Sequence, residues 1–228
     1  MDNAKKLILE TLKTKACLKQ DVFKKTKDIF QGFKKEAQKL VDELAEEMDQ
    51  VSQDVPVRFI DKDDYEFHIK FGGDILVFFM HTNVFDFEKS HPIWKTSYLK
   101  DDELRAYCGM INVYNFLSDS FKYNRLNDVG YLVARLFLNK DQHYFVEGKR
   151  QLGFLYNDFV NEVISKDKIR NIIESSILYS MDFDLLTPKY ETMQNVSVHE
   201  VNEVTSAMSI KTGKRLGFKF QADNDNID

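Results

Sequence analysis

The chain of 228 residues is long enough for one core with appendages, and its content of 43% hydrophobic and 30% charged residues is typical of a globular protein, which excludes overall disorder. Its net charge of −5 is unevenly spread, because residues 1–40 carry 11 Lys against five acidic residues and the remainder is acidic. That acidic part would oppose nucleic acid within the screening length, so we do not favour nucleic acid as a partner.

A long amphipathic helix is predicted for the N-terminal region, residues 1–52. Residues 4–52 contain no proline. Apolar side chains recur there at a seven-residue step: Phe23, Phe30, Ala37, Leu44 and Val51. Such a repeat keeps one face apolar, which suits packing along the protein's own sheet or association with another chain, and the pattern does not choose between them. Residues 4–18 are compatible with a separate helix.

Strands are predicted after Pro56, because the residue before a proline is disfavoured in the α region. Residues 61–64 are expected to form a first turn. Tyr65–Phe71 alternates apolar and polar residues, Gly72-Gly73 predicts a two-residue hairpin turn, and the apolar run Asp74–Thr82 predicts a central strand.

The second half of the chain predicts further strands and then helices. Residues 106–117, 128–138 and 143–146 are β-rich, with a hairpin turn at 139–142. A helix from Lys149 would place four apolar side chains on one stripe: Leu152, Leu155, Phe159 and Val163. Ser165 can cap a second helix, and Ser197 begins a capping-box sequence for a third.

These elements predict an α+β fold. We expect an antiparallel β-sheet of about six strands in two meanders, packed with the long N-terminal helix and two or three C-terminal helices. Residues 53–220 would form one domain that shares its core with the helical region 1–52, and residues 221–228 would be a disordered acidic tail.

An aromatic segment without clear periodicity, residues 83–100, is the strongest candidate for a binding loop. Its rings would either cover the second face of the sheet or line a groove for a ligand or partner helix. The candidate binding residues are Phe85, Phe87, His91, Trp94 and Tyr98.

Catalytic signatures are missing from the sequence: it contains no phosphate-binding glycine loop, no serine-hydrolase motif and no H-E-x-x-H. We predict no metal site, although His81, Asp86 and His91, with Asp64 across the hairpin, form a weak candidate because imidazole and carboxylate groups can bind a divalent cation. Cys108 lies in a predicted strand without a neighbouring base, which disfavours it as a nucleophile. We expect no cofactor.

The function that follows is a non-enzymatic protein-binding or adaptor module that acts through the amphipathic helix and the aromatic loop. A protein partner or self-association is expected, and a membrane is not. The alternatives are a small-molecule sensor domain and a metal-dependent hydrolase or nuclease. The two distant cysteines, the short apolar run at the N-terminus and the lack of a membrane-spanning segment favour the cytoplasm. Abundant Lys and Asn with scarce Pro favour a bacterium or phage as the source.

Overall fold

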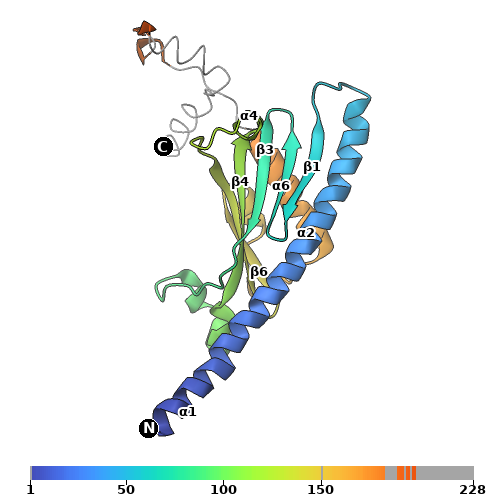
Figure 1. Cartoon of the computed structure of the whole chain (residues 1–228). Coiled ribbons are helices and arrows are strands. Elements are labelled where there is room, and N and C mark those ends of the chain that lie inside the picture. The colour runs from blue at the N-terminus through green and yellow to red at the C-terminus, as the bar shows by residue number, and fades with distance from the viewer. Residues whose placement is uncertain (1, 150, 183–188, 193, 196, 199–228) are drawn as a thin grey trace.

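The structure is a computed structural model, which describes residues 2–149, 151–182, 189–192, 194–195 and 197–198. A single long helical rod begins the chain (Figure 1). It consists of α1 (Asp2–Thr11), one π-helical turn, η1 (Leu12–Ala16), and α2 (Cys17–Asp49). The predicted break near residue 18 is therefore a change of helical pitch and not an interruption.

Six strands follow and pair in sequence order as one antiparallel sheet, which confirms the predicted α+β fold. The strands are β1 (Val57–Asp63), β2 (Glu66–Phe71), β3 (Asp74–Met80), β4 (Cys108–Leu117), β5 (Tyr131–Asn139) and β6 (Tyr144–Gly148). The two predicted three-stranded runs join through the pairing of β3 with β4.

Short helices occupy the connections, and one longer helix follows the sheet. Between β3 and β4 lie η2 (Pro92–Lys95), α3 (Ser97–Asp101) and η3 (Glu103–Ala106). The others are α4 (Ser118–Lys122), α5 (Gln151–Leu155), α6 (Lys166–Met181) and η4 (Tyr190–Thr192).

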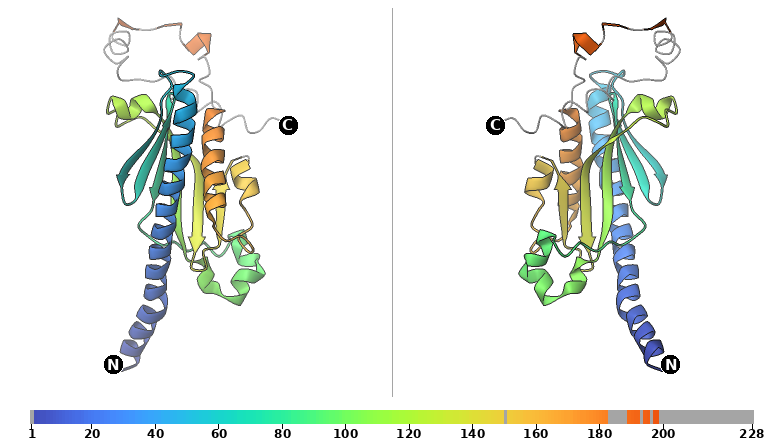
Figure 2. Two further views of the ribbon diagram at one scale, coloured as in Figure 1. Left: turned by 90° about the vertical axis from the view of Figure 1, so that its right-hand side faces the viewer. Right: turned by 90° about the vertical axis from the view of Figure 1, so that its left-hand side faces the viewer.

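The two long helices, α2 and α6, lie side by side on one face of the sheet, which we call the inner face (Figure 2). The bidentate pair of Arg170 with Glu43 joins them, with Nη1–Oε1 and Nη2–Oε2 distances of 3.0 and 2.6 Å. The opposite, outer face carries α4 near one end and the β3–β4 connection near the other.

The inner face is held by an aromatic contact between α2 and the sheet. Phe30 and Phe33 of α2 are almost fully buried, and their rings lie 5.4 Å from Phe67 and 6.3 Å from Phe78. Phe67 and Phe78 are stacked cross-strand partners at 4.6 Å. Most of the predicted apolar face of the helix is therefore used within the chain, although Val51 lies beyond α2 and is 78% exposed.

The predicted hairpin is confirmed, since Phe71 pairs with Asp74 and Gly72 has a φ of +53°, a conformation that favours glycine. The turn predicted at residues 61–64 was wrong. The strand β1 runs on to Asp63 through a register shift at the bulge between Asp61 and Asp63.

The helix predicted from Lys149 to Val163 was also wrong, because only Gln151–Leu155 is helical among the residues of this range that the structure describes. The following residues run along the free edge of β6, where the backbone N–H groups of Tyr144 and Val146 donate to the carbonyls of Glu162 and Tyr156. Pairing this strand edge satisfies backbone groups that a helix would have left open.

The N-cap at Ser165 is confirmed, since its hydroxyl accepts from the Lys168 N–H. The predicted helix beyond Val198 and the predicted tail, residues 221–228, lie outside the described residues.

A prediction follows from the close approach of α2 to β4. A Cβ on Gly109 would lie 2.1 Å from Thr26 Oγ1, so Gly109→Ala must push the helix from the sheet. We expect a loss of about 1–3 kcal/mol in the free energy of unfolding, measured by urea denaturation. Gly73→Ala is the matched control, because nothing lies within 4 Å of its added Cβ. Equal stability of the two variants would contradict this packing.

Candidate functional site

The N-terminal end of the long helix extends beyond the sheet, and we call residues 2–21 the projecting helix (Figures 1 and 2). Every residue from Asn3 to Cys17 is exposed, and Val22 is the first buried residue of the helix. The projecting helix is therefore a continuation of a rod whose buried side chains lie further along α2.

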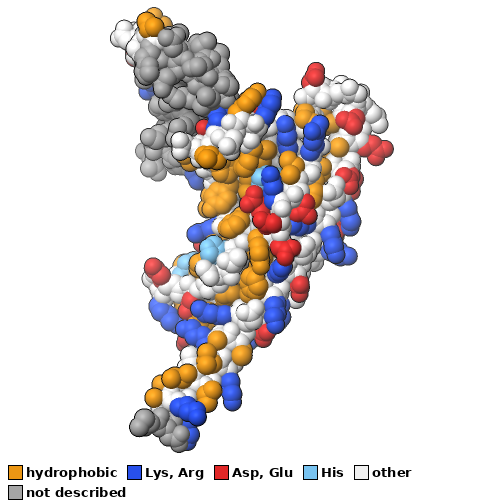
Figure 3. Space-filling view, in the orientation of Figure 1, with side chains coloured by type: hydrophobic (Ala, Val, Ile, Leu, Met, Phe, Trp, Pro, Cys, Tyr) orange, Lys and Arg blue, Asp and Glu red, His pale blue; other side chains and the backbone are white. Residues whose placement is uncertain are grey.

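Four apolar side chains of the projecting helix are exposed to solvent. Leu7, Ile8, Leu9 and Leu12 expose 64, 59, 45 and 52% of their surface, and Figure 3 shows apolar side chains along this end of the molecule. Isolated apolar residues on a surface are ordinary, but four within six positions of one helix are a concentration of the kind that marks interaction sites.

The projecting helix is also basic. It carries five lysines against three acidic residues. Two of these lysines, Lys15 and Lys19, place Nζ 5.3 Å from the centre of the Tyr107 ring, and the contact with Tyr107 raises the pKa of Lys15. These are cation–π contacts with the body of the protein. The remaining lysines of the projecting helix, Lys5, Lys6 and Lys13, lie closer to its N-terminus.

The π-helical turn lies where the rod leaves the body. Its side chains from Leu12 to Ala16 are all exposed. The hydroxyls of Thr11 and Thr14 donate to the carbonyls of Leu7 and Glu10, at 2.9 and 2.8 Å, so local polar groups support the wider turn. A π-turn adds one residue to a helix and changes the direction of the side chains on its two sides.

The aromatic segment predicted as a binding loop packs largely within the chain. The ring of Phe87 lies 5.1 and 5.7 Å from those of Phe137 and Phe145 on the outer face. Trp94 Nε1 donates to the Phe87 carbonyl at 3.2 Å, and Lys89 Nζ lies 3.3 Å from the Trp94 ring centre. This geometry matches the covering role that was one of the two expectations for the segment.

Phe85 and His91 belong to the same segment but have different neighbours. Phe85 forms an isolated bridge with Cys108, and its ring lies 4.8 Å from that of His81. His91 caps η2, where its Nδ1 accepts from the Ile93 N–H. A ligand-binding role for these residues stays a prediction.

Tyr98 is the most tightly held of the five. Its hydroxyl donates to Asp141 Oδ2 at 3.1 Å and accepts from Asn139 Nδ2 at 3.0 Å. Its ring stacks on His143 at 4.7 Å, with the Arg105 guanidinium 4.1 Å from the ring centre. Burial, with Asp141 nearby, raises the pKa of Tyr98 to about 12, so the phenol stays protonated and donates.

The weak metal candidates have other contacts in the structure. His81 Nδ1 accepts from the Asn83 N–H, Asp86 accepts from the Phe87 N–H, and Asp64 pairs with Lys27 at 2.6 Å. Among the residues that the structure describes, no three His, Cys, Asp or Glu side chains group as a metal site requires. Burial also raises the pKa of the Cys108 thiol, which keeps it in its unreactive protonated form.

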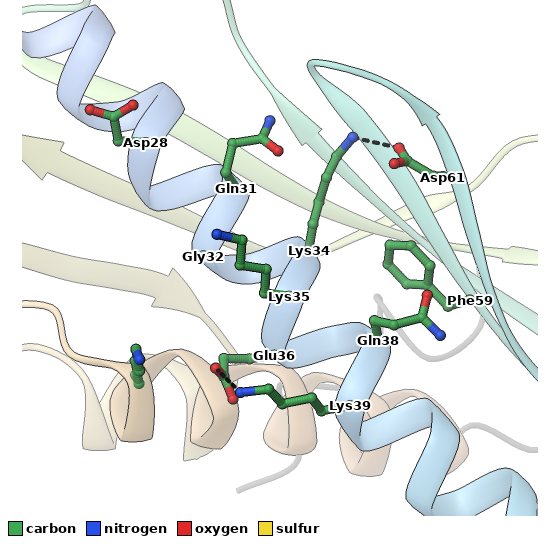
Figure 4. Close-up of a pocket in the computed structure, with 11 residues that line it drawn as sticks. Asp28, Gln31, Gly32, Lys34, Lys35, Glu36, Gln38, Lys39, Phe59 and Asp61 are labelled. Atoms are coloured by element: carbon green, nitrogen blue, oxygen red, sulfur yellow. Dashed lines mark hydrogen bonds and ion pairs between the residues drawn. The ribbon is translucent and has the colours of Figure 1, made fainter.

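A cavity of about 580 Å³ lies beside α2, where the helix faces β1 and the start of α6 (Figure 4). Several lysines line it, but Lys34 pairs with Asp61 and Lys39 with Glu36, at 2.9 Å for the second pair. With acidic and basic side chains interleaved in this way, the cavity has no strong preference for a cation or an anion.

Comparison with known proteins gives no information about the role of this site. No family model matches the chain, and neither the curated proteins nor the solved structures gave a match. In the described part of the chain, no helix is long and apolar enough to cross a membrane.

The exposed apolar patch on the projecting helix was missed by sequence reasoning, which assigned the apolar face of the whole region to Phe23–Val51. The apolar run Leu7-Ile8-Leu9 and Leu12 is visible in the sequence, but Leu9 lies 14 residues before Phe23 and so continues the seven-residue repeat. The repeat alone therefore does not separate the exposed part of the helix from the buried part.

A stability prediction follows from Tyr98. Tyr98→Phe leaves the Asn139 side-chain amide, on a residue only 1% exposed, without this acceptor, and we expect a loss of about 1–3 kcal/mol in unfolding free energy. Tyr114→Phe is the control, since no described residue hydrogen-bonds the Tyr114 hydroxyl. Chemical denaturation of both variants measures the difference, and an unchanged Tyr98→Phe would contradict the described network.

A pH prediction follows from His68 on the outer face. The residue is 1% exposed, with Phe121 against its ring at 4.9 Å, and burial lowers its pKa below the ordinary 6.5 despite the opposing contact with Glu66. The unfolded chain therefore takes up a proton more readily, so this contribution to stability is present above pH 6.5 and declines as the pH falls below it.

We expect His68→Gln to show a weaker loss of unfolding free energy between pH 7.5 and pH 5.5 than the wild type. Urea denaturation at the two pH values measures this difference. Parallel pH dependence in the two proteins would show that His68 is not held neutral.

Proposed function

We propose that this chain is a non-enzymatic protein-binding module that engages another protein through the projecting helix. The observation that supports this most directly is the exposure of Leu7, Ile8, Leu9 and Leu12 on a helix whose residues from Asn3 to Cys17 are all exposed. A docked amphipathic helix recognises its partner through such a set of closely spaced apolar anchors.

The anchoring of α2 supports the same proposal. A free helix of about 20 residues is only marginally stable in water, because its first turn is costly to form. Here the rod continues from α2, whose side chains Phe30, Phe33 and Ala37 are buried on the sheet. The projecting helix is therefore presented already folded, which lowers the entropic cost of binding.

The contacts of the aromatic segment, residues 83–100, favour a smaller role for this segment in the proposed function. The rings of Phe87 and Tyr98 contact side chains of the outer face and its connections. Tyr107 follows the segment at the end of the same β3–β4 connection, and its ring makes the cation–π contacts with Lys15 and Lys19. We therefore assign this connection as a whole to positioning the root of the projecting helix.

Site-specific photo-crosslinking in the host cell tests the proposal. With p-benzoylphenylalanine at Ile8, we expect light-dependent adducts of defined mass, because a bound partner lies within reach of the crosslinker. The same group at Lys62, an exposed position of β1, is the control and should give none. Absence of adducts from Ile8, or equal adducts from both positions, would overturn the proposed function.

A further inference from the structure

The long helix carries opposite charges at its two ends. The projecting helix is Lys-rich, whereas residues 40–57 contain no Lys or Arg and hold six acidic side chains, all exposed: Asp42, Glu43, Glu46, Glu47, Asp49 and Asp54. At 1.5 Å per residue, Ile8 and Glu47 lie roughly 60 Å apart along the rod. This distance is many times the screening length at physiological salt, so the two ends do not neutralise each other within one molecule.

Exposed apolar side chains accompany the charge at both ends. Leu7 and Ile8 are more than half exposed at the basic end. Val51 and Val55 are 78 and 41% exposed at the acidic end, which we define as residues 42–55. The two ends therefore complement each other in charge and share the apolar character that an interface core requires.

We propose that the partner of the projecting helix is a second copy of this chain, paired antiparallel, so that the projecting helix of each copy lies on the acidic end of the other. This inference rests on the proposed function, since it names the partner of the same surface. A two-fold axis forms both contacts at once, because each copy supplies one basic and one acidic end.

The antiparallel arrangement is the one that the charges favour. A parallel pair would place five lysines of one helix beside five of the other, and six acids beside six. A stable interface buries about 800 Å² on each partner, and a single face of a helix between about five and six turns long is small against that area. Two symmetric contacts supply more area together than either does alone.

An anionic lipid surface could also attract a basic amphipathic helix. The second copy fits better, because residues 41–228 are strongly acidic and an anionic surface would repel them, whereas the second copy makes use of that charge. The test must therefore distinguish binding to a lipid surface from pairing with a second copy of the chain.

Light scattering of the full chain over a range of concentrations is the first measurement. We expect a concentration-dependent mass that approaches twice 26.8 kDa, with a dimer dissociation constant that rises about tenfold or more between 50 and 500 mM salt. A wild-type mass that stays at one chain throughout would overturn the inference.

Charge reversal at each end provides the decisive variants. Lys5→Glu/Lys13→Glu changes the net charge of the projecting helix from +2 to −2, and Asp42→Lys/Glu46→Lys/Glu47→Lys/Asp49→Lys changes that of residues 42–55 from −6 to +2. Each variant then carries like charges at its two ends, so we expect each alone to dimerise at least about tenfold more weakly. An equimolar mixture restores opposite charges at both contacts and should recover the dimer. Lys62→Glu is the surface control, and a mixture that stays monomeric would overturn the antiparallel pairing.

The outcomes distinguish this inference from the proposed function. A monomer that gives Ile8 adducts with a different protein would overturn self-pairing and keep the protein-binding function, whereas a monomer without adducts would overturn both. Cosedimentation with vesicles of phosphatidylserine and phosphatidylcholine, lost in Lys5→Glu/Lys13→Glu, together with a monomeric wild type, would assign the helix to a lipid surface and overturn the inference.

Discussion

The packing of Phe30 and Phe33 onto the stacked pair Phe67 and Phe78 is the contact on which the rest of the structure depends. Burying each such ring stabilises the fold by roughly 1.5–3 kcal/mol relative to its exposure. The contact fixes the direction of α2 across the sheet, and Gly109 allows the helix to approach β4 closely. The direction of the rod beyond the sheet is a consequence of this packing.

Much of the fold could be predicted from the sequence, because its signals are local. The Gly72-Gly73 turn specifies the pairing of β2 with β3, and Ser165 specifies the start of α6. The segment after Lys149 could not be predicted in this way. Its apolar spacing is helical, but the open edge of β6 competes for the same backbone, and only the assembled sheet reveals that edge.

The candidate site was less predictable than the fold. Aromatic residues such as Trp94 indicate burial or binding equally well from sequence, and the difference depends on whether neighbours such as Phe137 and Phe145 are near. The exposed patch at Leu7 and Ile8 depends on where the sheet ends beneath the helix. That boundary is a property of the tertiary structure and has no local sequence signal.

The two edges of the sheet have a consequence for the behaviour of the protein at high concentration. Residues 156–164 cover the edge at β6, and the edge at β1 is interrupted by the bulge at Asp61 and Asp63 and carries the charges of Arg58 and Lys62. Such features block strand-to-strand growth between molecules. The phenylalanines of the strands, such as Phe67 and Phe78, thus belong to a sheet whose edges resist extension into amyloid-like aggregates.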